Sequence, residues 1–294
     1  MRTLLMSVAA LALTAAAPPK KIVPNDIVSA APASAWRAIP AEDLLVMTLE
    51  GGGRVVIQLA PSFAPVHVAN IRAMALGNYW QGAAVYRVQD NYVAQWGINE
   101  TKRALPRGAV AKPPHEYWRS ARGLAIAPLG SPDAYAAGAG FSGGWPVIRY
   151  RDGNVSTPHC YASVGVARDL HPDTGNGGEL YAIIGHAPRQ LDRNIAVVGR
   201  VISGIEQLSA LPRGSEAMGF YKEGFVAKLI IGVTLASALP ASARPAFQMM
   251  NTASPSFARY LQLRKNRDDD FYRVAAGGVD ICNVPVPVRP IPGR

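Results

Sequence analysis

The 294-residue sequence has few charged residues and few histidines, and each scarcity excludes a class of protein or site. Charged residues make up 17% of the chain and hydrophobic residues 49%, which excludes a disordered polar chain without a core. The 30 basic residues outnumber the 20 acidic ones, but they are scattered in runs no longer than two, so no nucleic-acid patch is indicated. The five histidines lack the spacing of metal ligands. The sequence therefore predicts no metal and no cofactor.

Long apolar runs are also scarce, and the one clear case lies at the N-terminus. Arg2 precedes an apolar run at residues 4–13, and small residues follow as far as Ala17. This order is typical of a secretory signal peptide, predicted here as residues 1–16. The run is too short to span a bilayer as a helix. We therefore expect a periplasmic or secreted protein without a stable membrane span, with an uncleaved N-terminal anchor as the alternative.

Only two cysteines are present, Cys160 and Cys282. In an oxidising compartment an even count allows one disulfide, which would tie the C-terminal part of the chain to its main body. Two buried free thiols are the alternative, because a sequence does not show whether two cysteines meet.

Alternating apolar and polar residues predict a mainly β protein. Such alternation lies on both sides of Gly51-Gly52-Gly53, as in a β-hairpin, and Pro65 begins a helical pattern that ends at Gly77. A short helix is expected at residues 204–211. Further strands are expected at residues 83–88, 92–96, 180–184, 196–202 and 226–235. Many strands and two short helices indicate a closed antiparallel barrel with helices over its ends.

The composition divides the chain into segments. Residues 17–41 are rich in Pro and Ala and are interpreted as a linker before a main domain at residues 42–237. Within that domain, residues 99–162 form a long insertion rich in Gly and Pro. A C-terminal extension, residues 238–294, follows.

The C-terminal extension is predicted to contain one helix. Ser254 and Pro255 have the residue types of an N-cap and a first helical position, and the helical pattern extends to Tyr272. The last twelve residues are Pro-rich and are expected to be extended. We expect this extension to pack on the barrel; the alternative is a partner-binding arm.

A glycine-rich stretch at residues 138–144 matches two functional motifs. The letters GAGFSGG contain both a dinucleotide-binding pattern and a nucleophile-elbow pattern around Ser142. Both motifs need an apolar strand before them and a helix after them, and neither is predicted here. The stretch is interpreted as a flexible loop, and a hydrolase using Ser142 is the minor alternative.

The most informative stretch is residues 85–97. Arg87, Tyr92 and Gln95 lie on two adjacent predicted strands joined by a tight turn at Asp90-Asn91. A hairpin can point all three side chains to one face. An arginine beside aromatic and amide groups, with no acid or nucleophile nearby, indicates a donor cluster beside an apolar pocket rather than hydrolytic machinery.

This stretch resembles the cyclophilin signature F-H-R-V-I-x-x-F-M-I-Q-G-G. Residues 45–70 resemble the family's opening hairpin and first helix, and residues 177–183 resemble N-S-Q-F-F-I. Residues 190–201 resemble W-L-D-G-x-x-x-V-F-G-x-V, and residues 166–168 resemble the strand that binds substrate backbone. The matches cover most of residues 42–237 in order, and the sequence is identified as a divergent, exported bacterial member of the cyclophilin-type peptidyl-prolyl isomerases.

The resemblance implies a cyclophilin-like closed antiparallel β-barrel capped by two short helices. It also implies cis–trans isomerisation of X–Pro bonds in proline-containing polypeptides, by a monomer that needs no cofactor and assists the folding of exported proteins. Arg87, Tyr92 and Gln95 are the implied catalytic residues. The implied substrate-binding residues are Tyr86, Val93, Ala167, Arg168, Glu179, Tyr181, Gln190, Leu191 and Ile195.

Several of these residues depart from the family pattern. Tyr86 stands where a His is usual, Glu179 where a Gln is usual, and Gln190 where a Trp is usual. An alternative function is therefore a peptide-binding or chaperone module with weak catalysis. We further expect Glu179 to form a direct bidentate pair with Arg87, which would restrain catalysis; the alternative is that Glu179 faces solvent.

Overall fold

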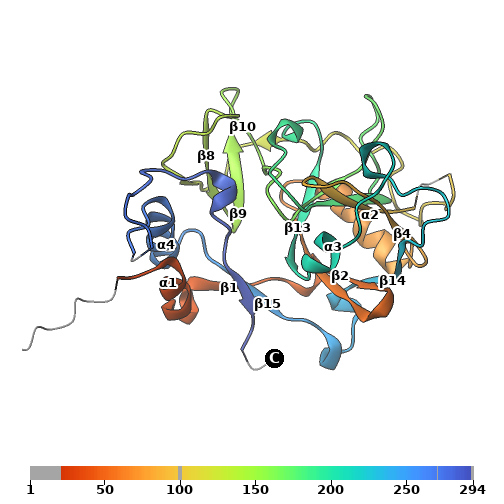
Figure 1. The fold of residues 1–294 in the computed structure, drawn as a ribbon, viewed down its shortest axis with the longest axis horizontal. Coiled ribbons are helices and arrows are strands. Elements are labelled where there is room, and N and C mark those ends of the chain that lie inside the picture. Colours follow the sequence, from red (N-terminus) through yellow and green to blue (C-terminus); the bar gives the residue numbers. More distant parts are fainter. Residues whose placement is uncertain (1–20, 99–100, 270, 293–294) are drawn as a thin grey trace, which may run out of the picture.

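In the computed structural model, which describes residues 21–98, 101–269 and 271–292, eight strands close into an antiparallel barrel (Figure 1). Their bounds are β2 (Leu44–Leu49), β3 (Arg54–Leu59), β4 (Ala84–Val88), β5 (Val93–Gly97), β11 (Ser163–Val166), β12 (Glu179–Ile183), β13 (Val197–Ser203) and β14 (Lys228–Leu235). The order around the barrel is β11-β12-β5-β4-β14-β2-β3-β13, and β13 pairs with β11 to close it. The predicted barrel is confirmed.

Two helices accompany the barrel, α2 (Pro65–Leu76) and α3 (Glu206–Ser209). Pro65 is the first residue of α2, and Gly77 follows its last turn, as the sequence predicts. Val68, Ile71 and Met74 of α2 are fully buried in the barrel core. Helix α3 is shorter than predicted and buries Leu208 in the same core.

The insertion contains a second sheet that the sequence does not predict. Its strands are β6 (Arg119–Ser120), β7 (Ala127–Pro128), β8 (Gly138–Ser142), β9 (Trp145–Arg149) and β10 (Asn154–Ser156), in the order β6-β10-β9-β8-β7. Residues 138–144 are therefore a strand and a tight turn rather than a flexible loop. Gly143 and Gly144 both have positive φ, as a two-residue hairpin turn requires.

The N-terminal and C-terminal segments meet in a third sheet. Strand β15 (Phe247–Met250) lies between β1 (Trp36–Ala38) and β16 (Val288–Pro290), and all pairs are antiparallel. Helix α1 (Pro24–Ala30) packs beside α4 (Pro255–Lys265), whose N-cap Ser254 accepts a bond from the Phe257 N–H as predicted. Residues 24–38 are thus folded elements rather than the predicted linker.

Short 3₁₀ turns connect these elements. They are η1 (Ala33–Ala35), η2 (Ala41–Asp43), η3 (Glu50–Gly52), η4 (Arg189–Leu191), η5 (Ala217–Gly219), η6 (Ala236–Ala238), η7 (Ala241–Ala243) and η8 (Ile281–Asn283). In the described ranges, no helix is long and apolar enough to cross a membrane. The predicted signal peptide, residues 1–16, lies outside the described residues.

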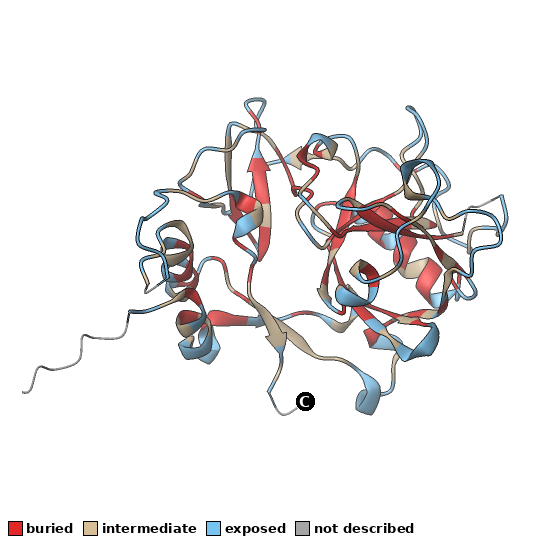
Figure 2. Cartoon of the chain, viewed as in Figure 1, coloured by how far each residue is buried: buried red, intermediate tan, exposed pale blue. Residues whose placement is uncertain are grey.

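A second hydrophobic core lies beside the barrel (Figure 2). It joins the N-terminal segment, the insertion and the C-terminal extension, with Trp36, Phe141 and Phe257 among its buried members. The rings of Phe141 and Phe257 pack edge to face with centroids 4.9 Å apart. The extension was expected to pack on the barrel. It does so only through Phe247, Met249 and Val288, and most of its buried residues belong to the second core instead.

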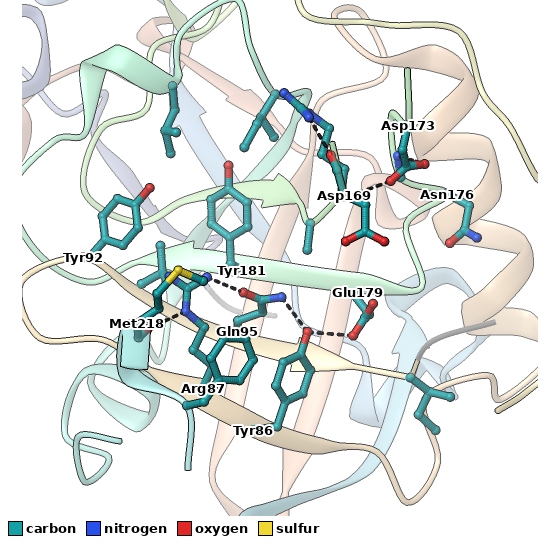
Figure 3. Close-up of a pocket in the computed structure, with 18 of the residues that line it drawn as sticks. Tyr86, Arg87, Tyr92, Gln95, Asp169, Asp173, Asn176, Glu179, Tyr181 and Met218 are labelled. Atoms are coloured by element: carbon teal, nitrogen blue, oxygen red, sulfur yellow. Dashed lines mark hydrogen bonds between the residues drawn. The ribbon is translucent and has the colours of Figure 1, made fainter. Parts of the chain in front are cut away.

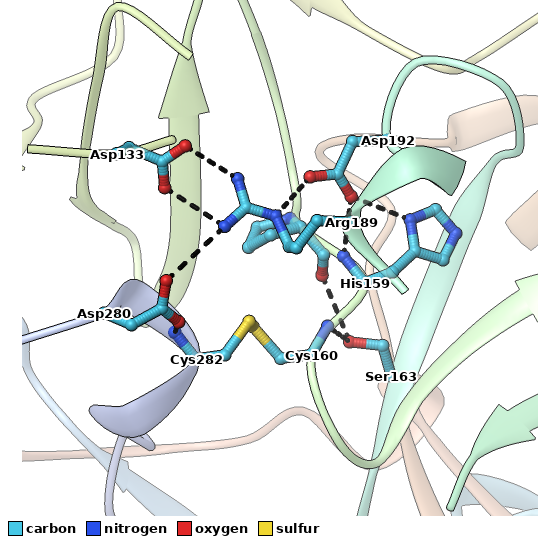
Figure 4. Close-up of a disulfide and its surroundings, with 9 residues drawn as sticks. Asp133, His159, Cys160, Ser163, Arg189, Asp192, Asp280 and Cys282 are labelled. Atoms are coloured by element: carbon cyan, nitrogen blue, oxygen red, sulfur yellow. Dashed lines mark hydrogen bonds and ion pairs between the residues drawn. A yellow bond between two sulfur atoms is a disulfide. The ribbon is translucent and has the colours of Figure 1, made fainter. Parts of the chain in front are cut away.

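The predicted disulfide is present and joins the insertion to the extension. Cys160 lies just before β11, and Cys282 lies in η8, 122 residues later. A buried ionic network lies beside the bridge (Figure 4). Arg189 pairs with Asp133 of the insertion and with Asp192, and Asp192 also binds His159. The bridge and the network thus connect η4 and the segment before β11 to the insertion and the C-terminal extension.

Replacing both cysteines, as Cys160→Ser with Cys282→Ser, should lower the free energy of unfolding by about 2–4 kcal/mol, because the bridge closes a long loop in the unfolded chain. Denaturant unfolding of the oxidised wild type and the double variant measures this loss. In unreduced native protein we expect no thiol to react with an alkylating reagent; two freely alkylated cysteines would contradict the bridge.

Candidate functional site

The candidate site is built on the hairpin of β4 and β5. Arg87 lies directly opposite Gln95 in the antiparallel register, so both side chains leave the sheet on the same face. Asn91, with a φ of 51°, makes the tight turn between the strands. Tyr92 follows that turn, and the Arg87 guanidinium lies 5.8 Å from the centre of its ring. The structure therefore brings the three predicted catalytic residues together.

These residues line an open cavity of about 490 Å³. Eleven of the twelve predicted site residues line it: Tyr86, Arg87, Tyr92, Val93, Gln95, Ala167, Arg168, Glu179, Tyr181, Leu191 and Ile195. Gln190 does not, because the turn η4 directs Arg189 inward and leaves Gln190 exposed beside Leu191. Gln190 is thus not a lining residue of the cavity, and its substrate-binding role stays a prediction.

The floor of the cavity is apolar. Val93, Tyr181 and Ile183 form a buried cluster, against which Leu191 and Ile195 pack. The Tyr181 hydroxyl is not offered to the cavity, because it lies 3.1 Å from the His159 imidazole of the buried network. Burial raises the pKa of Tyr181 well above its ordinary value, so the phenol stays neutral. The floor can therefore accept the apolar ring of a proline.

Arg87 is held by acceptors on three sides, and Figure 3 shows its bonds to Gln95 and Met218. Its Nη1 donates to Gln95 Oε1 at 2.9 Å, its Nη2 to Gln89 Oε1 at 2.6 Å, and its Nε to the Met218 carbonyl at 2.7 Å. The ring of Phe220 lies 5.4 Å from the guanidinium. Burial lowers the pKa of Arg87 from its ordinary value, which still leaves an arginine charged at neutral pH.

Glu179 does not form the expected bidentate pair with Arg87. Its Oε1 accepts a hydrogen bond from the Tyr86 hydroxyl at 2.7 Å, and the Arg87 nitrogens bond to the three acceptors named above. Tyr86 and Gln95 therefore stand between the carboxylate and the guanidinium (Figure 3).

The cavity also contains residues that the sequence did not indicate. Met218 and Phe220 come from a loop around η5 that lies along β4, where Phe220 forms an isolated bridge with Arg87. No motif marks this loop, since its contact with Arg87 depends on the tertiary fold. The other unpredicted lining residues are Ile98, Ala111, Lys112, Asp169, Asp173, Gly175 and Asn176.

The histidines that are buried have protein partners. His67 Nδ1 lies 2.7 Å from Glu116, and His159 Nδ1 lies 2.9 Å from Asp192. Among the residues that the structure describes, no three His, Cys, Asp or Glu side chains are grouped so that they could hold a metal ion.

Comparison of the sequence and the fold with known proteins assigns this chain to a family. The sequence model described as "Cyclophilin type peptidyl-prolyl cis-trans isomerase/CLD" matches residues 44–230, which include every lining residue of the cavity. The chain belongs to the cyclophilin family. The family was identified from the sequence by its motifs, and this assignment is now confirmed.

Relatives and solved structures agree with the family. A "Probable peptidyl-prolyl cis-trans isomerase" of Brucella suis is 28% identical over 180 residues, covering 61% of this chain and 76% of the relative. A protein of the same name from Brucella melitensis gives the same values. The crystal structure of cyclophilin AquaCyp293 from Hirschia baltica has a TM-score of 0.70 at 23% identity, covering 87% of this chain and 93% of that chain. This last likeness concerns the fold, and it extends beyond the barrel to most of the chain.

Proposed function

We propose that this cyclophilin catalyses cis–trans isomerisation of X–Pro bonds in proline-containing polypeptides. The observation that carries the proposal is Arg87, held by Gln95 at the edge of an apolar-floored cavity. The reaction breaks no bond; it must lower a rotational barrier of about 18–20 kcal/mol that arises from amide resonance. A charged donor and an apolar pocket for the proline ring are the groups that this reaction needs.

Arg87 can favour the twisted amide over the planar one. Rotation removes the resonance, so the prolyl nitrogen regains a lone pair that accepts a hydrogen bond. Arginine has five N–H donors, and three are used in bonds to described residues, which leaves one on each Nη for the substrate. A bond that forms only in the twisted state accelerates the reaction about tenfold for each 1.4 kcal/mol.

A protease-coupled assay with a chromogenic Ala-Pro peptide tests the proposal. The protease cleaves only the trans peptide, so the cis fraction is cleaved at the rate of isomerisation. We expect that rate to rise linearly with the concentration of this cyclophilin. No acceleration, together with measurable binding of the same peptide, would favour the peptide-binding or chaperone alternative.

Isomerisation should be insensitive to chelators and nucleotides, because the proposed chemistry uses only Arg87 and the apolar pocket. The measurement is the protease-coupled rate with and without EDTA, after exhaustive dialysis, using a metal-independent protease. An equal rate is expected. A large loss in EDTA that a single added metal restores would show that the site contains a metal ligand set.

We also propose that the protein is exported and acts on exported polypeptides. The Cys160–Cys282 disulfide supports this, because structural disulfides persist in oxidising compartments, and residues 1–16 have the pattern of a signal peptide. Expression of the full chain in a Gram-negative host, followed by N-terminal sequencing of the periplasmic fraction, tests it. Protein that begins near residue 17 supports export; full-length chain confined to the cytoplasm contradicts it.

A further inference from the structure

Four cavity residues form one continuous chain of hydrogen bonds that ends at the Arg87 guanidinium (Figure 3). Tyr86 Oη donates to Glu179 Oε1 at 2.7 Å, and Gln95 Nε2 donates to Tyr86 Oη at 2.5 Å. Gln95 Oε1 then accepts from Arg87 Nη1 at 2.9 Å. Three adjacent barrel strands supply these side chains, with β5 between β4 and β12, so the chain runs across the sheet.

The chemistry of Glu179 fixes which group donates and which accepts in each of these hydrogen bonds. An ionised carboxylate only accepts hydrogen bonds, so the single hydroxyl proton of Tyr86 must point to it. The Tyr86 oxygen then has only lone pairs to offer Gln95, which presents its NH₂ group there. The Gln95 carbonyl oxygen is thereby turned toward Arg87. The opposite amide orientation would place NH₂ donors against guanidinium donors.

We propose that Tyr86 and Glu179 are positioning residues that fix the Gln95 amide and, through it, the Arg87 guanidinium. This inference rests on the proposed isomerase function for its catalytic consequence. Two further features of the structure restrict movement of the Tyr86 ring. Phe220 stacks on it with centroids 6.1 Å apart, and the ring is only partly exposed.

The Tyr86 hydroxyl stays protonated at the pH values at which the protein is assayed. Burial is the main cause that raises its pKa well above the ordinary value, and the charge and hydrogen bond of Glu179 raise it further. Tyr86 therefore acts as a fixed donor to Glu179 and not as an acid or base.

Two single variants and their combination test the chain. Tyr86→Phe keeps the ring that stacks on Phe220 but removes the hydroxyl. Glu179→Leu removes the acceptor, so the Tyr86 proton can turn to Gln95 Oε1 and reverse the amide. We expect each to lower kcat about 3- to 10-fold, the effect of about one neutral hydrogen bond, with KM nearly unchanged.

The double variant decides whether the two residues act through one chain. If both act only by orienting Gln95, the double variant loses no more kcat than the poorer single variant. Multiplying losses would overturn the inference, as would wild-type kcat in either single variant. Tyr161→Phe is the matched control, because Tyr161 is 49% exposed and does not line the cavity; its kcat should equal that of the wild type.

A spectroscopic readout separates failure of this inference from failure of the proposed function. The Arg87 guanidinium N–H resonances should be resolved in the wild type, since Arg87 is held on three sides. They should broaden through faster rotation in both single variants and stay unchanged in Tyr161→Phe. Unchanged resonances in both variants, with thermal melting that shows folded protein, would contradict the proposed positioning of Arg87 by Tyr86 and Glu179. This result would count even if the wild type proved inactive.

Discussion

Arg87→Ala should lower kcat/KM for an Ala-Pro peptide by about a hundredfold, measured in the protease-coupled assay. The loss corresponds to about 3 kcal/mol, the scale of one or two charge-assisted hydrogen bonds that form in the twisted state. The fold should survive, because the side chain lies at an open cavity, where water can reach the acceptors left by the guanidinium. Circular dichroism of the same sample checks this.

Two companion variants sharpen the result. Arg87→Lys keeps the positive charge but loses the planar fork, so we expect an activity between those of Arg87→Ala and the wild type. Arg213→Ala is the matched control, since Arg213 is an exposed arginine that pairs with Asp90 at the tip of the same hairpin. Equal activity of Arg87→Ala and Arg213→Ala would remove Arg87 from the mechanism.

Arg189→Met should lower the free energy of unfolding by about 3–5 kcal/mol, the usual cost of breaking a buried ion pair from one side. Arg189 is only 4% exposed, and it bonds through both Nη atoms to Asp133 at 3.0 and 3.1 Å and through Nε to Asp192 (Figure 4). Methionine fills a similar volume but leaves both carboxylates buried without their cation. Urea unfolding at neutral pH measures the loss.

The matched control for this prediction is Arg122→Met, an exposed arginine of the insertion. A surface substitution of this kind usually changes stability by less than about 0.5 kcal/mol. A loss below 1 kcal/mol in Arg189→Met would show that the network contributes little.

Because His159 connects Asp192 to Tyr181, the Arg189→Met variant should also weaken peptide binding at the cavity floor.

Local patterns in the sequence were enough to predict the barrel and the grouping of Arg87, Tyr92 and Gln95, whereas the other pocket residues were predicted from the resemblance to the cyclophilins. The β2–β3 hairpin follows from alternation around three glycines, and α2 follows from Pro65 and Gly77. Arg87 and Gln95 could be placed together because a hairpin brings opposite residues to one face. Each of these features depends on residues that lie close together in the sequence, so a short stretch of sequence is enough to predict it.

Features that depend on distant partners could not be predicted in this way. Strand β1 pairs with β15, which lies more than 200 residues later, so residues 36–38 have no local signal of a sheet. The insertion strands are two to five residues long, and β8 begins GAG, a poor strand sequence in isolation. Gln190 does not line the cavity, because the turn η4 buries Arg189 and leaves Gln190 exposed.

The most direct test of the central claim is exchange NMR of a short Ala-Pro peptide with catalytic amounts of this cyclophilin. The method observes the cis and trans signals of the peptide itself, without a protease. Uncatalysed interconversion takes tens to hundreds of seconds, too slow for exchange cross-peaks. We predict cross-peaks between the cis and trans signals with the wild type and their loss with Arg87→Ala. Their absence with folded wild-type protein that binds the peptide would contradict the proposed function.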